Sequence, residues 1–259
     1  MDKVILFSMH GFELTLFEAF YYFWWWAIVG WFLEVIVRTL ETGAFENRGF
    51  LNGPYCPIYG VGVLGAIILF NQLDLMDHVV ILYFLAVFLC SSLELLVGVI
   101  LMKLFHAKWW DYSHEKFNYK GYICLKISLL WGVGCITVIK VIQPLVETAV
   151  NYIPPTFGNI MAGVVMAIII SDIVATLSEI KNFNYSLKQM DQIAEILHVK
   201  SINLGENISD EVIALKAKYE KLLEQTKHQA RIIKAFPTMT SIKYNDTLKL
   251  IKERLNIKK

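Results

Sequence analysis

Long runs of apolar residues, separated by short polar stretches, fill the first two thirds of the chain. A helix needs about 20 apolar residues to cross a bilayer core that is roughly 30 Å thick. The pattern predicts five such helices, at residues 15–38, 57–73, 78–104, 122–143 and 157–179. We therefore expect an all-α, polytopic membrane protein with about five transmembrane helices.

A heptad pattern begins where the fifth predicted span ends. Its positions alternate three and four residues apart, at Ile173, Thr176, Ile180, Phe183, Leu187, Met190, Ala194 and Leu197. The same spacing returns after a polar break at residues 201–209, and Pro237 ends the second run. A last short amphipathic helix is predicted at residues 243–257. Such heptads are typical of packed helices. They fit an antiparallel hairpin and a dimeric coiled coil equally well, so we expect a transmembrane bundle over residues 1–180 and a helical or coiled-coil tail over 181–259.

Loop charges predict the orientation of the helices, because Lys and Arg accumulate on the cytoplasmic side. The loop at 39–56 carries Arg48, and the loop at 105–121 carries three lysines. The loops near residues 74–77 and 147–155 carry neither residue type, and Lys3 is the single exception to the trend. From Lys181 onward the chain has 15 Lys or Arg against 9 Asp or Glu. The N-terminus is therefore expected outside, and the C-terminus and its tail in the cytoplasm.

The composition agrees with a membrane protein, and the missing motifs argue against several classes of protein and site. Hydrophobic residues make up 56% of the chain, against about 45–50% in soluble domains. The four cysteines form no C-x-x-C pair, so neither a disulfide framework nor a zinc site is expected. The N-terminus shows no cleavage pattern of a signal peptide. P-loop, H-E-x-x-H, G-x-S-x-G and dinucleotide motifs are absent from the sequence, and no cofactor, metal or catalytic residue is predicted.

Ionisable residues inside the predicted spans are the main indication of a functional site. A charge in the bilayer centre costs at least about 2.5–3.5 kcal/mol. With the predicted orientation, Glu34, Glu94, Lys126 and Asp172 all fall in the cytoplasmic half. The alternative is that the acids brace the bundle and that Lys126 extends to the membrane surface. Arg38, four residues after Glu34, is within reach to pair with it.

Two irregular segments lie at the same depth as these charges. Residues 49–62, GFLNGPYCPIYGVG, are too apolar for an ordinary exposed loop and too interrupted by Gly and Pro to be the start of a helix alone. Such backbone is tolerated at membrane depth only beside protein or a water-filled cavity. We expect it to line a polar pocket with Asn52, Tyr55, Cys56 and Tyr59. Residues 109–121, WWDYSHEKFNYKG, either form an aromatic interface belt or offer Asp111 and Asn118 to a ligand.

The two irregular segments, together with SSLELLVG at 91–98, WFLEV at 31–35 and Trp131, resemble the putative ABC-transporter type IV family. The resemblance covers about residues 15–180. It implies a bacterial, multi-pass cell-membrane protein with a transport role, and it does not extend to the tail.

Three functions follow from these observations. The first is a permease-type transport subunit with its ligand in the cytoplasmic-half pocket. It is driven by a separate ATPase subunit or by an ion gradient through Glu34 and Glu94. The second is a sensor or scaffold acting through the cytoplasmic coiled coil. The third, a membrane enzyme acting on lipid, ranks last because no nucleophile–base pair supports it. The expected partners are membrane lipids, the ATPase and, through the tail, a second copy of the chain. The tail has no nucleic-acid-binding motif.

Overall fold

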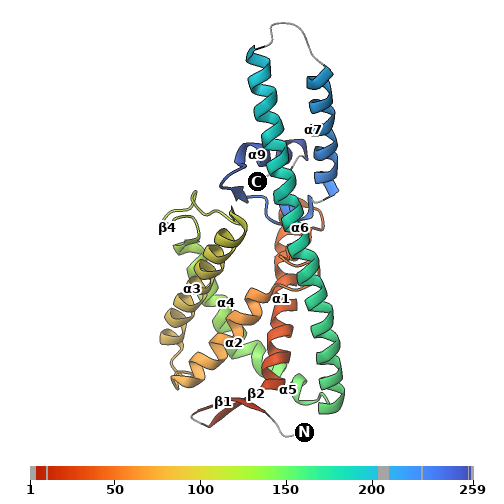
Figure 1. The fold of residues 1–259 in the computed structure, drawn as a ribbon. Coiled ribbons are helices and arrows are strands. Elements are labelled where there is room, and N and C mark those ends of the chain that lie inside the picture. The colour runs from red at the N-terminus through yellow and green to blue at the C-terminus, as the bar shows by residue number, and fades with distance from the viewer. Residues whose placement is uncertain (1–3, 10, 204–209, 229, 256, 258–259) are drawn as a thin grey trace. The chain divides into compact units, whose positions relative to one another are not determined.

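The computed structural model describes residues 4–9, 11–203, 210–228, 230–255 and 257, which are mostly helical (Figure 1). The chain forms two compact units. The first contains Met1–Val99 and Asp111–Ile173, and the second contains Ile100–Trp110 and Val174–Lys259. Two helices, α3 (Val79–Phe105) and α6 (Pro155–Asn203), continue from one unit into the other. The division predicted at residue 180 stays a prediction.

The first unit begins with a β-hairpin that the apolar pattern did not predict. Strand β1 (Ile5–Met9) pairs antiparallel with β2 (Phe12–Thr15), and Gly11 turns the chain at a φ of 79°. Helix α1 (Leu16–Thr42) follows at once. The Thr15 hydroxyl accepts from the Glu18 N–H at 3.2 Å, while the Glu18 carboxylate accepts from the Thr15 N–H at 2.8 Å. This capping box satisfies two backbone donors and starts the helix at this position.

The remaining helices of the first unit are α2 (Pro57–Gln72), part of α3, and an interrupted helix. That helix consists of α4 (Leu125–Thr137), a π-helical turn η1 (Val138–Ile142) and α5 (Gln143–Asn151). Pro144 explains the interruption, because it has no N–H to donate to the preceding turn. A short β-hairpin, β4 (Asn118–Tyr119) and β5 (Ile123–Cys124), precedes α4.

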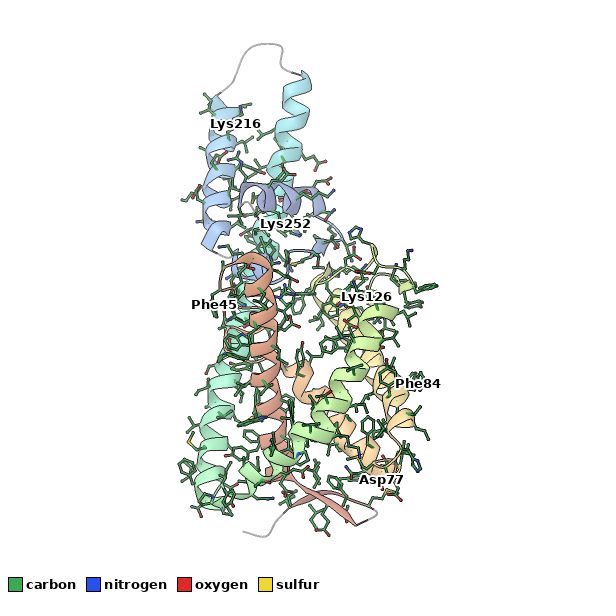
Figure 2. The ribbon with its side chains drawn as sticks, turned by 180° about the vertical axis from the view of Figure 1, so that it is seen from behind. Phe45, Asp77, Phe84, Lys126, Lys216 and Lys252 are labelled. Atoms are coloured by element: carbon green, nitrogen blue, oxygen red, sulfur yellow. The ribbon has the colours of Figure 1, made fainter. Side chains whose placement is uncertain are left out.

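Four helices of the structure are long and apolar enough to cross a membrane: Leu16–Thr42, Val79–Phe105, Leu125–Asn151 and Pro155–Leu197. Many of their side chains face outward, as Phe84 does on α3 (Figure 2). Exposed apolar faces of this kind suit contact with lipid. Helix α2 has 16 residues, which span about 24 Å, less than the bilayer core. Within the described part of the chain, four candidate spans are therefore confirmed by length and composition, and the total of five and the orientation stay predictions.

The core of the first unit forms around α2. Helix α2 lies between α1 and the α3–α4 pair (Figure 1). Its buried Val63, Ala66, Ile67 and Phe70 pack in one cluster with residues of α1, α3, α4 and α5. A second cluster joins Ala27 of α1 to Ile169 of α6 and to the irregular segment between α1 and α2. This segment is therefore packed between two helices rather than exposed as a loop.

The second unit contains the last turns of α3, the rest of α6, and helices α7 (Asp210–His228), α8 (Ala230–Ala235) and α9 (Asn245–Arg254). Most of the heptad positions on α6 are buried, from Thr176 to Met190. Helix α7 runs back along α6, with Thr226 against Met190. Strand β3 (Ala107–Lys108) pairs with β6 (Thr240–Ser241), and Trp109 packs edge-on against Phe236. The predicted seam differs at Ile173 and Ala194, which are exposed. In the second heptad run, which Pro237 ends, the predicted position Gln229 lies outside the described residues.

Candidate functional site

One row of α1 carries the residues from which the site is built. Side chains four positions apart form a ridge along a helix. On α1 this row consists of Tyr22, Trp26, Gly30, Glu34 and Arg38. All five are buried except Glu34, which is partly buried. Along this row, therefore, an otherwise apolar helix presents polar or small groups to its neighbours.

Tyr59 of α2 crosses this row at Gly30. A Cβ atom at Gly30 would lie 2.2 Å from Cγ of Tyr59, so only glycine allows the tyrosine ring to rest against the α1 backbone. From there the Tyr59 hydroxyl donates to Oε1 of Glu34 at 2.6 Å. The other carboxylate oxygen, Oε2, lies 3.6 Å from Nε of Arg48. Glu34 is thus held by one tyrosine and one arginine, both from the stretch between residues 48 and 59.

Glu94 of α3, like Glu34 of α1, accepts a hydrogen bond from a tyrosine hydroxyl. It is 8% exposed, and its Oε1 accepts from the Tyr112 hydroxyl at 3.1 Å. Trp131 of α4 packs edge-on against Tyr59, with ring centroids 5.5 Å apart. The same indole approaches the Glu94 carboxyl. Two acids from different helices are therefore each bound by a tyrosine hydroxyl, and Trp131 contacts the tyrosine of one acid and approaches the carboxyl group of the other.

The Tyr112 phenol is influenced by both acids. Burial raises the pKa of this phenol well above the ordinary value, and the negative charges of Glu94 and Glu34 raise that pKa further. Both carboxylates therefore act on one hydroxyl. We refer to Glu34, Arg48, Tyr59, Glu94 and Tyr112 as the Glu34–Glu94 cluster. Its tyrosines remain protonated at neutral pH and act as hydrogen-bond donors.

Asp172 of α6 forms a separate group with the irregular segment. Its Oδ1 accepts from the backbone and side-chain nitrogens of Asn52, each at 3.0 Å, and its Oδ2 accepts from the Gly53 N–H at 2.8 Å. The Tyr55 hydroxyl also donates to Oδ2. We call this group the Asp172 clamp. Several donors satisfy the carboxylate, so its observed contacts fix the segment to α6, and the binding of a ligand by Asp172 stays a prediction.

Cys56 lies between the two groups and is buried. Its N–H donates to the Ala27 carbonyl at 2.8 Å, which attaches the segment to α1. Burial raises the pKa of the Cys56 thiol to about 12, with Glu34 raising it and Arg48 lowering it. The thiol is therefore protonated at neutral pH and is a poor nucleophile.

The other predicted site residues lie apart from these groups. Lys126 is the second residue of α4 (Figure 2) and pairs with Glu115 at 3.5 Å; its side chain is 73% exposed. The Asp111 carboxylate accepts from the N–H and hydroxyl of Ser113. Asn118 donates to the Glu115 carbonyl and accepts from the Gly121 N–H. Their observed contacts shape the loop before α4, and their binding of a ligand stays a prediction.

Sequence reasoning misassigned one ion pair and missed several partners. Arg38 binds Glu46 at 2.7 Å and Glu41 at 3.4 Å, whereas Glu34 binds Arg48. These contacts replace the Arg38–Glu34 pair that the spacing allowed, because α1 turns Arg38 toward the chain that follows Gly43. For the segment at 109–121 the sequence left open an aromatic belt or a ligand site with Asp111 and Asn118, and Tyr112 was not among the residues predicted for a ligand. No motif or periodicity in the sequence relates Tyr112 to Glu94, so their contact could not be predicted.

A further polar contact lies nearer the start of α1. The Trp26 indole N–H donates to Gln143 Oε1 at 2.8 Å, and Gln143 Nε2 lies 3.2 Å from Glu147 Oε1. Trp26 and Gln143 are both buried. The interruption at η1 immediately precedes Gln143, which the sequence analysis did not select. Polar contacts thus occur at two levels along the same row of α1.

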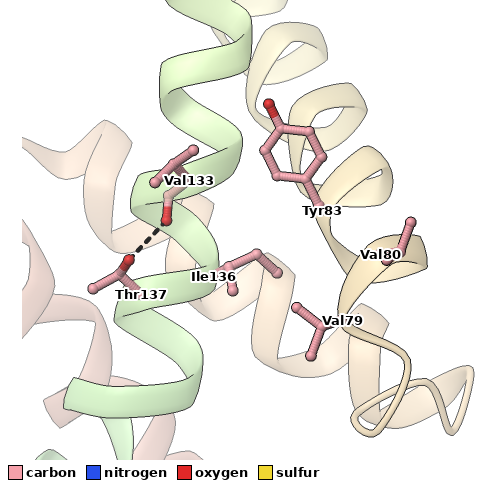
Figure 3. A pocket seen from close by; sticks show the side chains of 6 residues that line it. All are labelled: Val79, Val80, Tyr83, Val133, Ile136 and Thr137. Atoms are coloured by element: carbon pink, nitrogen blue, oxygen red, sulfur yellow. Dashed lines mark hydrogen bonds between the residues drawn. The ribbon is translucent and has the colours of Figure 1, made fainter.

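An apolar groove of about 300 Å³ lies elsewhere in this unit, between α3 and α4 (Figure 3). Its lining residues are Val79, Val80, Tyr83, Val133, Ile136 and Thr137. None of the predicted site residues lines it, and its character suits a lipid chain. Among the described residues, no group of three or more His, Cys, Asp or Glu could hold a metal ion.

Comparison with known proteins gives the family. No curated protein and no solved structure matches the chain. A family model described as "Putative ABC-transporter type IV" matches residues 21–177. The match spans the apolar helices and includes Glu34, Glu94 and Asp172, so the resemblance seen in the sequence motifs is confirmed. The chain belongs to the putative ABC-transporter type IV family of membrane proteins.

Proposed function

We propose that this protein is a permease-type component of a membrane transporter and that its ligand path passes the Glu34–Glu94 cluster. The observation that carries the proposal is the pair of acids on α1 and α3, each bound by a tyrosine hydroxyl within a bundle of apolar helices. Ionisable groups at such positions are costly and usually serve transport or proton transfer. The family assignment supports the same role.

The row along α1 supports a path in the direction of the helix. From Glu34 it continues past Gly30 to Trp26, whose indole binds Gln143. Polar side chains therefore accompany α1 over much of its length. A π-helical turn precedes Gln143, and such turns often occur at functional sites. We place the ligand site at the Glu34–Glu94 cluster and a second polar constriction at Trp26 and Gln143.

The orientation in this proposal follows the loop charges. Arg48 and the lysines of the loop before α4 lie in the cytoplasm, and the Glu34–Glu94 cluster opens toward that side. Helix α2 serves as the short fifth span. Because the sequence has no P-loop, the energy comes from a separate ATPase subunit or from an ion gradient.

The experiment compares cells that lack the gene with cells that produce the wild-type chain, Glu34→Gln or Glu94→Gln. Elemental and metabolite contents are measured, because they require no prior choice of ligand. We expect the wild type to change the content of at least one solute and both variants to lose that change. Glu13→Gln, an exposed acid on β2, is the matched control. Wild-type contents in both variants would contradict the proposal.

A second function, a sensor or scaffold, is favoured by one observation. Helix α6 continues from Pro155 to Asn203, so a spanning segment and the beginning of the tail belong to one helix. A rigid helix of this length can pass a movement from the bundle to the tail. Under this alternative, removing residues 181–259 abolishes the phenotype and both glutamine variants keep it. Under transport, the shortened chain keeps part of its activity.

A further inference from the structure

We infer that Glu94 takes up one monovalent positive charge, as a proton or as an alkali cation such as Na⁺, and is the coupling site of the protein. This inference deepens the proposed transport function and rests on it. The shared chemistry is the neutralisation of one buried carboxylate.

The first argument is the state of the buried polar atoms around Glu94. Its Oε2 is buried and has no hydrogen-bond partner among the described residues, although the Trp131 indole approaches the carboxyl. The hydroxyl of Ser91 is likewise buried and without a partner in the described structure. Ser91 precedes Glu94 by three residues and lies on the same side of α3. Two oxygen atoms on neighbouring turns are therefore available to a positive charge.

The second argument is the unsatisfied state itself. A buried carboxylate oxygen without a donor carries a large desolvation penalty. Most buried polar atoms in proteins have a partner, and exceptions require an explanation. Protonation or a bound cation removes the penalty by cancelling the charge, whereas the Tyr112 hydroxyl satisfies only Oε1.

The third argument is the charge of the surrounding groups. When both carboxyl groups are ionised, Glu34 and Glu94 contribute two negative charges and Arg48 one positive charge, so these three side chains together carry one net negative charge. One proton or one monovalent cation neutralises them, while a divalent ion would overcompensate. Among the described residues, the titratable groups that face Glu94 or its partners come from several neighbouring elements: Glu34 from α1, Arg48 and Cys56 from the chain between α1 and α2, Tyr59 from α2, Cys90 from α3, Tyr112 from the loop before α4 and Cys124 from β5.

The experiment uses the purified full-length chain in detergent and has two arms. In sodium-free choline buffer, infrared difference spectra between about pH 5 and pH 9 report protonated carboxyl groups. At fixed pH, the second arm measures binding of ²²Na⁺ at equilibrium. We expect either a carboxyl band that Glu94→Gln removes, or saturable binding of one sodium ion per chain that Glu94→Gln abolishes. The first result identifies a proton and the second an alkali cation.

A second variant keeps the test decisive if Glu94→Gln does not fold. In the wild type, the like charge of Glu34 favours a neutral or cation-bound Glu94. Glu34→Gln removes that charge and therefore favours the ionised, unbound form of Glu94. We therefore expect the protonation midpoint to move to lower pH, or sodium affinity to fall by about tenfold or more. A purely structural role for Glu34 would not move the Glu94 signal in this direction. Glu13→Gln should leave both readouts unchanged.

The outcomes separate this inference from the proposed function. The inference is overturned if folded wild-type protein gives neither signal, or if the signal persists in Glu94→Gln. Charge uptake by Glu94 without any change in cellular solutes would support the charge-uptake site but contradict transport, and with it the coupling role. Solute changes without charge uptake by Glu94 would support transport and contradict the inference.

Discussion

At the scale of single residues, Gly30 determines how closely α2 can approach α1. Tyr59 reaches Glu34 only because no side chain stands at residue 30. Glycine in a helix normally costs about 1 kcal/mol relative to alanine. Gly30 nevertheless allows the close contact between α1 and the Tyr59 ring. The same residue therefore affects both the packing of the two helices and the hydrogen bond to Glu34.

We predict that Gly30→Ala destabilises the protein, because the new Cβ would overlap the Tyr59 ring at 2.2 Å. Overpacking of this kind costs about 1–3 kcal/mol and should also weaken the Tyr59–Glu34 bond. Thermal unfolding in detergent measures the loss. Gly65→Ala on α2 is the matched control, since nothing lies within 4 Å of its added Cβ. Equal stability of the two variants would contradict the close-contact explanation.

The Asp172 clamp gives a second prediction at this scale. Asp172→Asn loses the charge and one acceptor oxygen, so the donors of Asn52, Gly53 and Tyr55 cannot all be satisfied. Hydrogen bonds to charged groups contribute about 1.5–3 kcal/mol, and we expect the irregular segment to detach more often from α6.

Labelling of Cys56 with a maleimide measures this detachment, in chains whose other cysteines are replaced by alanine. In the folded protein burial protects the thiol and raises its pKa to about 12. Detachment returns that pKa toward the ordinary value and exposes the sulfur, so labelling at neutral pH should become about tenfold faster or more. Asp77→Asn, in the turn between α2 and α3, serves as control. An unchanged rate in Asp172→Asn would refute the clamp.

At the scale of elements, α6 is a spanning helix that continues into the second unit. Its heptad positions are buried between Thr176 and Met190, where α7 lies alongside. Arg231 of α8 also binds Glu179 of α6 at 3.0 Å. Packing of α7 and α8 on this face thus joins the C-terminal part of the chain to α6.

We predict that Phe183→Ala loosens the second unit, because Phe183 is fully buried on α6. Removing a buried phenylalanine costs about 3–5 kcal/mol. Amide hydrogen exchange should become faster in α7, α8 and α9, while exchange around Glu34 changes little. Tyr185→Ala, whose side chain is 62% exposed, should have no comparable effect. If amide exchange in α7 of the Phe183→Ala variant stayed as slow as in the wild type, the heptad face of α6 would not be what stabilises α7.

At the scale of the whole molecule, the orientation in the membrane decides which groups face the cytoplasm. The proposed topology puts Lys116 and the C-terminal tail inside and Asp77 and Tyr152 outside. It follows from the unequal distribution of Lys and Arg among the loops.

We predict that Lys116→Cys, in a background without other cysteines, reacts with an impermeant maleimide only after the membrane is permeabilised. Asp77→Cys and Tyr152→Cys should react in intact cells. Tyr152 is 83% exposed, so burial would not explain a failure there. Reaction of Lys116→Cys from outside would reverse the orientation and place the Glu34–Glu94 cluster near the opposite face.

The amino-acid sequence by itself determined the helices and the class of protein. Apolar runs specify spanning helices through local length and composition. Gly and Pro mark the chain before Pro57 as irregular, whereas the rest of the 49–62 stretch, from Pro57 onward, belongs to helix α2. These are properties of neighbouring residues, so no tertiary information is needed. The same local logic failed for the N-terminal β-hairpin, whose strands are stabilised by pairing with each other, and for the pairing of Arg38.

Only the tertiary structure decided which polar groups meet. Asp172 and Asn52 are 120 residues apart, and Glu94 finds Tyr112 across the end of α3. Such contacts depend on how helices pack and on the path of the chain between them, which periodicity does not encode. Residues 49–62 therefore remain central for a different reason. Tyr59 of this stretch binds Glu34, while Asn52, Gly53 and Tyr55 bind Asp172, because the chain at this point is packed between α1 and α6.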